Sequence, residues 1–299
     1  MHSLRWRGIQ DRAAAWALRL ALLGVNALAL LITVGLFLKS RPILALKPLS
    51  QLLFSSAWQP LRGNFGFWPF LIGTLEVTLL AMLLAVPVCL LSSIYLAEYA
   101  RSRLRNWVSP VIDLLAGIPS VVYGLWGVLV IVPAVRALGR LLSVATTGYS
   151  LLSGSVILAI MVTPVIISVS LEVLRSVPME ARETALALGA TRWEATKYVV
   201  LRSCQRGILA AVVLGFARAA GETMAVLMVV GNVARVPTSV FQPAYPLPAL
   251  IANNYGEMMS IPLYDSALML SALVLLVAVA AFNLLARLTL LHWTRSSEG

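Results

Sequence analysis

Hydrophobic residues occur along this chain in long runs, separated by short segments that carry most of the charged side chains. Six runs reach the roughly 20 residues that a helix needs to cross a membrane. They cover approximately 15–38, 71–96, 110–135, 152–174, 207–231 and 266–290. Barrel strands would instead give short alternating segments. The pattern predicts an all-α integral membrane protein with six transmembrane helices.

Composition supports a membrane protein and argues against nucleic acid as a partner. The chain has 299 residues, of which 60% are hydrophobic and 12% charged, whereas about one quarter of a soluble domain is charged. The net charge of +11 is scattered over loops between apolar runs, so we expect contact with membrane lipid and none with nucleic acid. Basic residues are nearly twice as frequent on the side of the two termini, which predicts that both termini are cytoplasmic.

Residues with catalytic or metal-binding chemistry are sparse. Cys89 and Cys204 are too few for a metal cluster, and His2 and His292 lie at the chain ends. No pairing of a nucleophile with a base is evident, and no phosphate-binding G-x-x-x-x-G-K-[ST] loop occurs. We therefore expect no catalytic residue, metal or cofactor on this chain, and any ATP hydrolysis to take place on a separate chain.

The polar segment 176–201 differs from an ordinary short loop. Ser176 and Pro178 favour a helix start, the following residues have high helix propensity, and Gly189 interrupts them before a second helical stretch. This pattern predicts a helix, a glycine turn and a further helix at the membrane surface. From the pattern alone, the segment is equally an amphipathic cap of the bundle.

Two charged residues interrupt the fifth apolar run. Arg218 and Glu222 are four positions apart, so a continuous helix would place them on one face, where they can pair. Small residues, including Ala211 and Gly215, extend that face and would let another helix approach closely. A charge at the centre of a membrane helix costs about 2.5–3.5 kcal/mol, which favours a functional role. A structural ion pair between helices is the alternative.

The segment before the fifth run resembles the E-A-A-x-x-x-G loop of ABC importer permeases. Glu183, Thr184, Ala185 and Gly189 occupy the motif positions. The resemblance implies that this loop couples the permease to an ATPase subunit. Thr184 replaces the family's middle alanine, and Leu201-Arg202 replaces its Leu-Pro, which leaves a kink at that point open.

A more specific resemblance covers most of the chain, from about Phe65 to Arg287. GFARAAGETMAVLMVVGN (215–232) is similar to the signature of permeases of the phosphate-specific transport (Pst) ABC importers, the C-subunit type more than the A type. FGFWPFLIGTL (65–75), YLAEYA (95–100) and GIPSVVYGLWG (117–127) match in the same order. The proline and glycines of the last motif predict close helix packing and a bend at Pro119.

The Pst resemblance implies a type I (MetI-like) permease fold with three regions. These are an N-terminal tail, first helix and outer loop (1–69), a transmembrane domain of five helices containing the coupling loop 176–201 (70–290), and a cytoplasmic tail (291–299). It also implies residence in the cytoplasmic membrane. The implied partners are a homologous A-type permease subunit, two ATP-binding subunits and an extracytoplasmic phosphate-binding protein.

The same resemblance suggests Arg218, Glu222 and Thr223 as residues of a phosphate path. Arginine binds phosphate through a planar fork, and Glu222 accepts a hydrogen bond only from an anion that keeps a proton. Phosphate keeps one near neutral pH, whereas sulfate and molybdate do not. Two alternatives remain open: a permease for sulfate or molybdate, and an ion-coupled secondary transporter that uses Arg218 and Glu222 as a proton relay.

Overall fold

A computed structural model describes residues 2–258 and 261–295 of the chain, and nearly all of its regular structure is helical. Within these residues, six helical segments are long and apolar enough to cross a membrane, which confirms the predicted class. They are Ala14–Leu46, Trp68–Tyr99, Ser120–Leu141, Leu151–Arg175, Arg192–Ala220 and Tyr264–Leu285. Four match the predicted runs closely, while the third and fifth differ.

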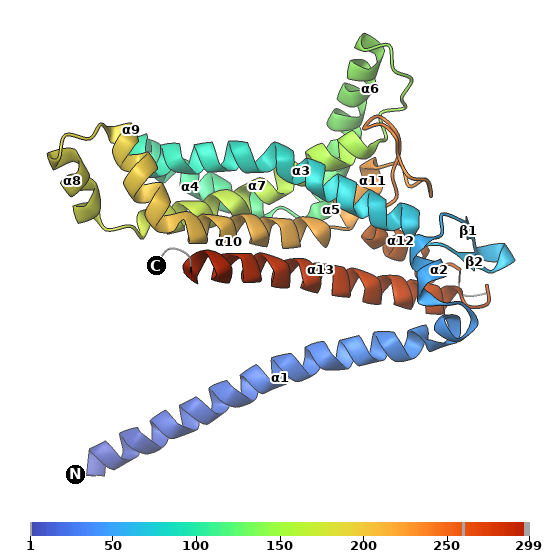
Figure 1. Cartoon of the computed structure of the whole chain (residues 1–299), viewed down its shortest axis with the longest axis horizontal. Helices are drawn as coiled ribbons and strands as arrows, with labels where there is room; N and C mark the ends of the chain where they lie inside the picture. Colours follow the sequence, from blue (N-terminus) through green and yellow to red (C-terminus); the bar gives the residue numbers. More distant parts are fainter. Residues whose placement is uncertain (1, 259–260, 296–299) are drawn as a thin grey trace.

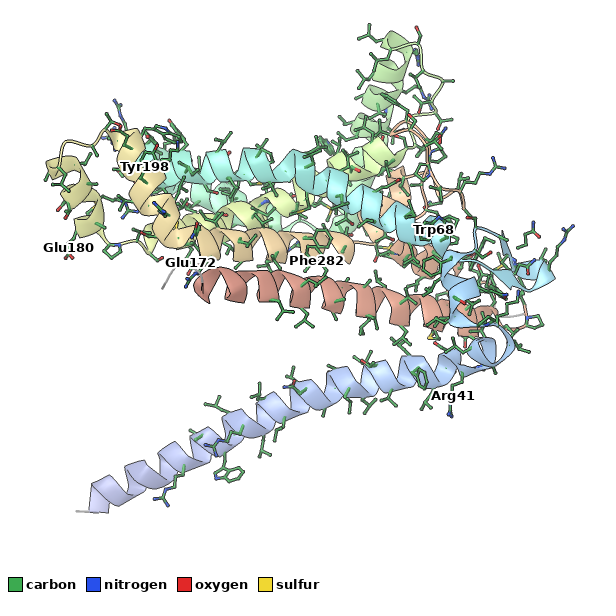
Figure 2. All side chains as sticks on the ribbon, viewed as in Figure 1. Arg41, Trp68, Glu172, Glu180, Tyr198 and Phe282 are labelled. Atoms are coloured by element: carbon green, nitrogen blue, oxygen red, sulfur yellow. The ribbon has the colours of Figure 1, made fainter. Side chains whose placement is uncertain are left out.

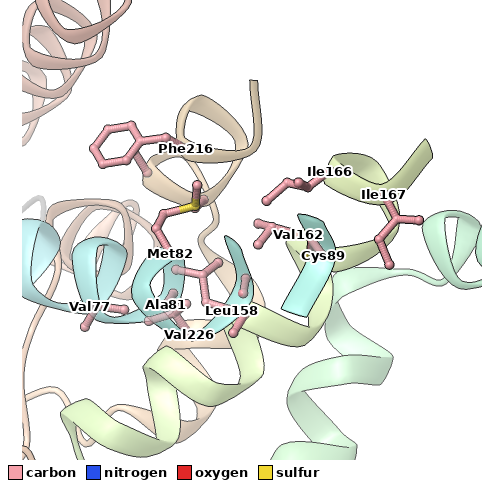
Figure 3. Close-up of a cluster of buried hydrophobic side chains, with 14 of the residues drawn as sticks. Val77, Ala81, Met82, Cys89, Leu158, Val162, Ile166, Ile167, Phe216 and Val226 are labelled. Atoms are coloured by element: carbon pink, nitrogen blue, oxygen red, sulfur yellow. The ribbon is translucent and has the colours of Figure 1, made fainter. Parts of the chain in front are cut away.

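The centre of the bundle is α7 (Leu151–Arg175), which packs against α3 (Trp68–Ile94) and α10 (Leu201–Ala220). Figure 3 shows side chains from these helices meeting in one apolar cluster, with Val162 and Ile166 of α7 facing Met82 of α3. Ser155 of α7 is fully buried, and its hydroxyl donates to the Val77 carbonyl of α3 at 3.2 Å. The burial of apolar side chains on all sides of α7 makes it the axis around which the site is built.

The first and last helices lie outside this core. α13 (Tyr264–Arg295) runs beside α10, where Phe282 stacks on Phe216 at a centroid distance of 3.5 Å. The C-terminal end of α1 (His2–Leu46) contacts α13, and toward its N-terminus α1 diverges from the bundle (Figure 1). There, the Ser266 hydroxyl donates to the Lys39 carbonyl at 2.9 Å and accepts from the Ile43 N–H at 3.2 Å. Residues 14–32 of α1 are exposed in this single chain.

The predicted third span, 110–135, is wrong as one continuous helix. α4 (Ser102–Gly117) ends before Pro119, and the membrane-crossing segment begins at Ser120 with α5 (Ser120–Trp126). It continues through the π-helical turn η3 (Gly127–Ile131) into α6 (Val132–Leu141), which projects from the bundle (Figure 1). Proline lacks an N–H and holds the residue before it in an extended conformation, so the bend expected at Pro119 becomes a full break.

One end of the bundle is built from short elements around a cluster of aromatic rings. Trp58 packs its ring against Phe70 at 4.8 Å and against Tyr264 at 5.9 Å. The short elements near this end are α2 (Leu49–Phe54), β1 (Trp58–Gln59), η1 (Pro60–Arg62), β2 (Asn64–Phe65) and α12 (Leu247–Asn254). The helix α12 begins directly after Pro246, at the end of a proline-rich stretch.

The opposite end carries the segment 176–201. Here lie α8 (Met179–Ala187), α9 (Arg192–Glu194) and the π-helical turns η2 (Tyr95–Tyr99) and η4 (Ala195–Val200). Figure 2 shows Glu172, Glu180 and Tyr198 at this end, and Arg41 and Trp68 at the other. α1 begins and α13 ends on the α8 side (Figure 1). Residues 296–299 of the predicted tail 291–299 lie outside the described residues.

Candidate functional site

The fifth predicted span, 207–231, is wrong as a continuous helix. α10 ends at Ala220, well short of the far end of α13 (Figure 1), and α11 (Met224–Val229) begins after a break. Gly221 has low helix propensity, and the backbone of Thr223 departs from helical geometry at φ −115°, ψ −60°. Arg218 therefore lies in the last turn of α10, while Glu222 and Thr223 lie in the break.

The break changes what Glu222 does. Its Oε1 accepts hydrogen bonds from the backbone N–H groups of Thr223 at 3.1 Å and of Ala225 at 3.4 Å. These are N–H groups at the start of α11, which have no partner within that helix. The Thr223 hydroxyl donates to the Gly221 carbonyl at 3.2 Å. Glu222 thus caps α11, and no ion pair joins it to Arg218 in the described part of the chain.

Arg218 is exposed in this single chain, although it lies within the span Arg192–Ala220. Its charge is near enough to the hydroxyl of Tyr123 on α5 to interact with it electrostatically. That hydroxyl donates to the Leu115 carbonyl at 2.8 Å, so Tyr123 also joins α5 to α4 across the Pro119 break. Tyr123 thus lies between the break at Pro119 and the charge of Arg218.

The small residues around the charged pair do not form one face. Ala211 and Gly215 point into the core, where a Cβ on Gly215 would lie 2.5 Å from Cγ1 of Ile166 on α7. On α11, Ala225 is buried against Gly124 of α5, whose added Cβ would lie 3.1 Å from the Ala225 Cα. The prediction that small residues allow close helix approach is confirmed, and Gly124 of the GIPSVVYGLWG motif packs against the signature segment.

The end of the signature, Gly231-Asn232, turns the chain after α11. Both residues have positive φ angles, 95° and 52°, which glycine and asparagine tolerate better than other residues. The Asn232 side chain donates to the Leu227 carbonyl at 2.8 Å, and the Ala244 N–H donates to the Val230 carbonyl at 3.1 Å. The signature thus encodes a helix end, a break, a short helix and a left-handed turn.

The coupling-loop residues form an exposed helix with a glycine end. Glu183, Thr184 and Ala185 lie in α8, with the first two exposed, and Gly189 has a φ of 88°. The N–H groups of Ala190 and Gly189 donate to the carbonyls of Ala185 and Leu186 at 3.1 and 3.0 Å. This is a Schellman ending, in which a glycine takes the left-handed position. After the turn, α9, η4 and α10 follow one another without an intervening loop, and the chain bends where the π-helical turn η4 meets α10 at Leu201-Arg202 (Figure 1).

A mostly buried ion pair ties α8 to the end of α3. The Arg182 guanidinium contacts Glu98 of η2 through both Nη2 and Nε, at 2.9 and 3.2 Å from Oε1. The side chains are only 15% and 11% exposed. Arg182 also donates to the carbonyls of Leu174 and Val177, and Arg192 donates to the Glu98 carbonyl at 2.9 Å. These contacts join α8 to η2, which follows α3, and to the end of α7.

Two of these relationships were not anticipated from the sequence. In the sequence, Glu98 stands out only as part of YLAEYA and Tyr123 only as part of a packing motif. Partners as far apart as Glu98 and Arg182, which are 84 residues from each other, leave no local signal. The capping of α11 by Glu222 does have a signal, since glycine followed by glutamate and threonine favours a helix break. Among the described residues, no group of three or more His, Cys, Asp or Glu side chains is arranged to hold a metal ion.

Residues 89–292 match the family described as "Binding-protein-dependent transport system inner membrane component". The "Phosphate transport system permease protein PstC" of Xylella fastidiosa strain 9a5c is 36% identical over 97% of this chain and 94% of its own length. The PstC protein of Mesorhizobium japonicum is 36% identical over 80% of this chain and 78% of its own. The "Probable ABC transporter permease protein YqgH" of Bacillus subtilis is 38% identical over 79% of this chain and 76% of its own.

The fold resembles a chain of a solved ABC transporter. A structure titled "Inward facing conformations of the MetNI methionine ABC transporter" matches with a TM-score of 0.54, covering 75% of this chain and 93% of the other at 20% identity. At that identity, the similarity concerns the fold alone. Together with the match over residues 89–292, it agrees with the helical architecture described above. The chain is a multi-pass membrane protein and belongs to the family of binding-protein-dependent transport system inner membrane components.

Proposed function

We propose that this chain is a permease subunit of an ATP-driven ABC importer that moves inorganic phosphate across the cytoplasmic membrane. Relatives named phosphate transport system permease proteins support the cargo, since one of them matches over 97% of this chain. The observation that carries the proposal is the position of Arg218. It is exposed within a membrane span and lies beside a helix break whose first residue, Gly221, is exposed too.

An arginine facing lipid there would cost about 2.5–3.5 kcal/mol. Non-helical backbone at membrane depth is tolerated only where protein covers it or where it lines a water-filled cavity. Arg218 and Gly221 together therefore favour a face that meets a second permease subunit, with an aqueous path between the two chains. A positive charge on that path attracts an anion.

Phosphate fits the groups at this point of the path. The Arg218 guanidinium offers a planar set of donors that no described residue engages by a hydrogen bond or ion pair. Glu222 uses Oε1 to cap α11, which leaves Oε2 to accept a hydrogen bond from an anion that keeps a proton. Oε2 of Glu222 would repel a fully deprotonated oxyanion, which has no proton to donate. Thr223 adds a hydroxyl whose proton goes to Gly221 and whose lone pair remains available.

The coupling loop supplies the link to ATP. Exposed apolar side chains flank the motif residues of α8: Met179, Leu186 and Leu188 are 64%, 44% and 84% exposed. An ATPase subunit on a separate chain would cover them, with α8 in contact with its surface. This assignment makes the α8 end, and with it both termini, cytoplasmic. ATP binding would move α8, and the Arg182–Glu98 pair would carry that movement to α3.

The family supports the remaining partners that we propose. The assembly would contain this chain, an A-type permease subunit, two ATP-binding subunits and an extracytoplasmic phosphate-binding protein. That binding protein would contact the outer segments 39–70 and 232–265. This chain itself would catalyse no covalent step and hold no cofactor.

Uptake of labelled phosphate tests the proposal in cells that depend on this system. Removing the chain should abolish uptake, and an excess of sulfate or molybdate should not compete. Competition by either oxyanion would instead favour a permease for that anion. Uptake that continues when the ATPase partner carries an inactivating substitution would favour an ion-coupled secondary transporter.

A further inference from the structure

A basic cavity lies at the α8 end of the bundle, away from the break between α10 and α11. It measures about 470 Å³ and is lined by Arg105, Asn106, Ser109 and Pro110 of α4 and by Arg175 at the end of α7. Both arginines also line an adjoining cavity of about 320 Å³ that reaches the Glu98–Arg182 pair. Neither arginine belongs to the signature or to the coupling motif, so the transport function leaves them unexplained.

The arginines of these cavities differ in their partners. Arg182 is paired with Glu98, and Arg192 donates to the Glu98 carbonyl and lies over the ring of Tyr99 at 5.4 Å. Arg105 and Arg175 are near enough for their like charges to act on each other. Within the described residues, neither has a carboxylate within 4.0 Å. The cavity therefore presents two positive charges that an anion would bring together.

Two carboxylates lie nearby and limit the charge of this site. Asp113 and Glu172 line a third cavity of about 290 Å³ together with Arg175. Neither forms an ion pair with Arg175 in the described part of the chain. Arg101 and Arg103 add positive charge next to Arg105, so the segment 101–105 carries three arginines in five residues. The surroundings remain basic overall.

Exposed apolar side chains on the neighbouring face of α4 indicate which kind of anion the cavity would bind. Trp107, Val111 and Leu114 are 80%, 55% and 68% exposed, and their spacing places them on one side of the helix. Tryptophan is enriched at the level of the lipid headgroups, and basic pockets between membrane helices bind anionic headgroups. Pro110 of the cavity is three positions from Trp107 and four from Leu114, so the apolar strip borders one side of the cavity on α4. Such a strip suits an acyl chain, whereas free phosphate would use only the cavity.

We propose that Arg105 and Arg175 bind the headgroup phosphate of an anionic phospholipid, with Asn106 and Ser109 as hydrogen-bond donors and the acyl chains along Trp107, Val111 and Leu114. This site is separate from the transport path. It lies against the junction of α4, α7 and α8, so a bound lipid would stabilise the end of the bundle that carries the coupling loop.

Native mass spectrometry of the whole transport complex tests this proposal through lipid binding, a measurement independent of transport. Phosphatidylglycerol and phosphatidylcholine are titrated against the wild type and the double variant Arg105→Gln/Arg175→Gln. Arg62→Gln/Arg140→Gln is the control, because it removes two exposed arginines elsewhere. We expect the wild type and the control to prefer phosphatidylglycerol, and the double variant to bind it about 30-fold more weakly.

Three results would overturn the proposal. Equal affinity for the two lipids in the wild type would show that no anionic headgroup is selected. Equal phosphatidylglycerol affinity in the double variant and the control would place any selection elsewhere, including on the partner permease. Displacement of the lipid by inorganic phosphate at equal concentration would make the cavity a site for the free anion.

Discussion

Arg218 and Glu222 lie four residues apart on either side of a helix end, and the Glu222 carboxylate binds the backbone of α11 at 3.1 Å from the Thr223 nitrogen. In a continuous helix, the two side chains would share a face and neutralise each other. The break separates them, because Glu222 satisfies the start of one helix while Arg218 occupies the end of another. Arginine at a helix C-terminus is also favoured by the helix dipole. Arg218 thus keeps its charge available at membrane depth.

Replacement of Glu222 separates its capping role from its charge. Glu222→Gln keeps an oxygen that accepts from the Thr223 N–H, so the complex should retain its thermal stability. Glu222→Ala removes the acceptor and should cost about 1 kcal/mol, as other capping residues do. Thermal unfolding of the purified complex measures both. Equal stability of the Gln and Ala variants would contradict the capping role.

Removing Arg182 should uncouple α8 from α3. The Ala variant leaves Glu98 mostly buried without its partner, and breaking such a pair costs about 3–5 kcal/mol. We expect Arg182→Ala to lower phosphate uptake strongly while ATPase subunits still co-purify. A double-mutant cycle with Glu98→Ala isolates the pair, and the double variant should be less destabilised than the sum of the single variants. Additive effects would exclude an energetic link between α8 and η2.

A larger residue at position 215 should separate α10 from α7. A Cβ there would already lie 2.5 Å from Ile166, so Gly215→Leu should destabilise the bundle by about 1–3 kcal/mol. Gly24→Leu is the matched control, since nothing lies within 4 Å of a Cβ at that position on α1. The measurement is the amount of folded protein in the membrane after heating. A control as damaging as Gly215→Leu would show that leucine itself causes the loss.

The turn after α8 depends on the left-handed conformation of Gly189. Its φ of 88° is unfavourable for a residue with a Cβ, so Gly189→Val should cost about 1–2 kcal/mol locally and displace Leu188 and Ala190. We expect weaker co-purification of the ATPase subunit with this variant. Gly35→Val serves as control, because that glycine is helical and has nothing within 4 Å of its Cβ position. Unchanged co-purification would argue against α8 as the docking element.

The sequence predicted the membrane class, the number of spans and the turn at Gly189, because apolar run length and glycine position are local signals. It predicted a bend rather than a full break at Pro119, and it missed the break at Gly221–Thr223; in both places the apolar run continues through the backbone break. Hydropathy measures transfer into lipid and does not register lost helical hydrogen bonds. Pairings such as Glu98 with Arg182 depend on how distant segments pack, so only the structure reveals them.

The most direct test of the central claim is the initial rate of phosphate uptake by Arg218→Gln at matched abundance in the membrane. Arg19→Gln, which removes an arginine from another span, is the control. Losing a charged hydrogen-bond donor costs about 1.5–3 kcal/mol, so uptake by Arg218→Gln should fall about 10- to 100-fold, while the control keeps the wild-type rate. Wild-type uptake by Arg218→Gln would contradict a phosphate path lined by Arg218.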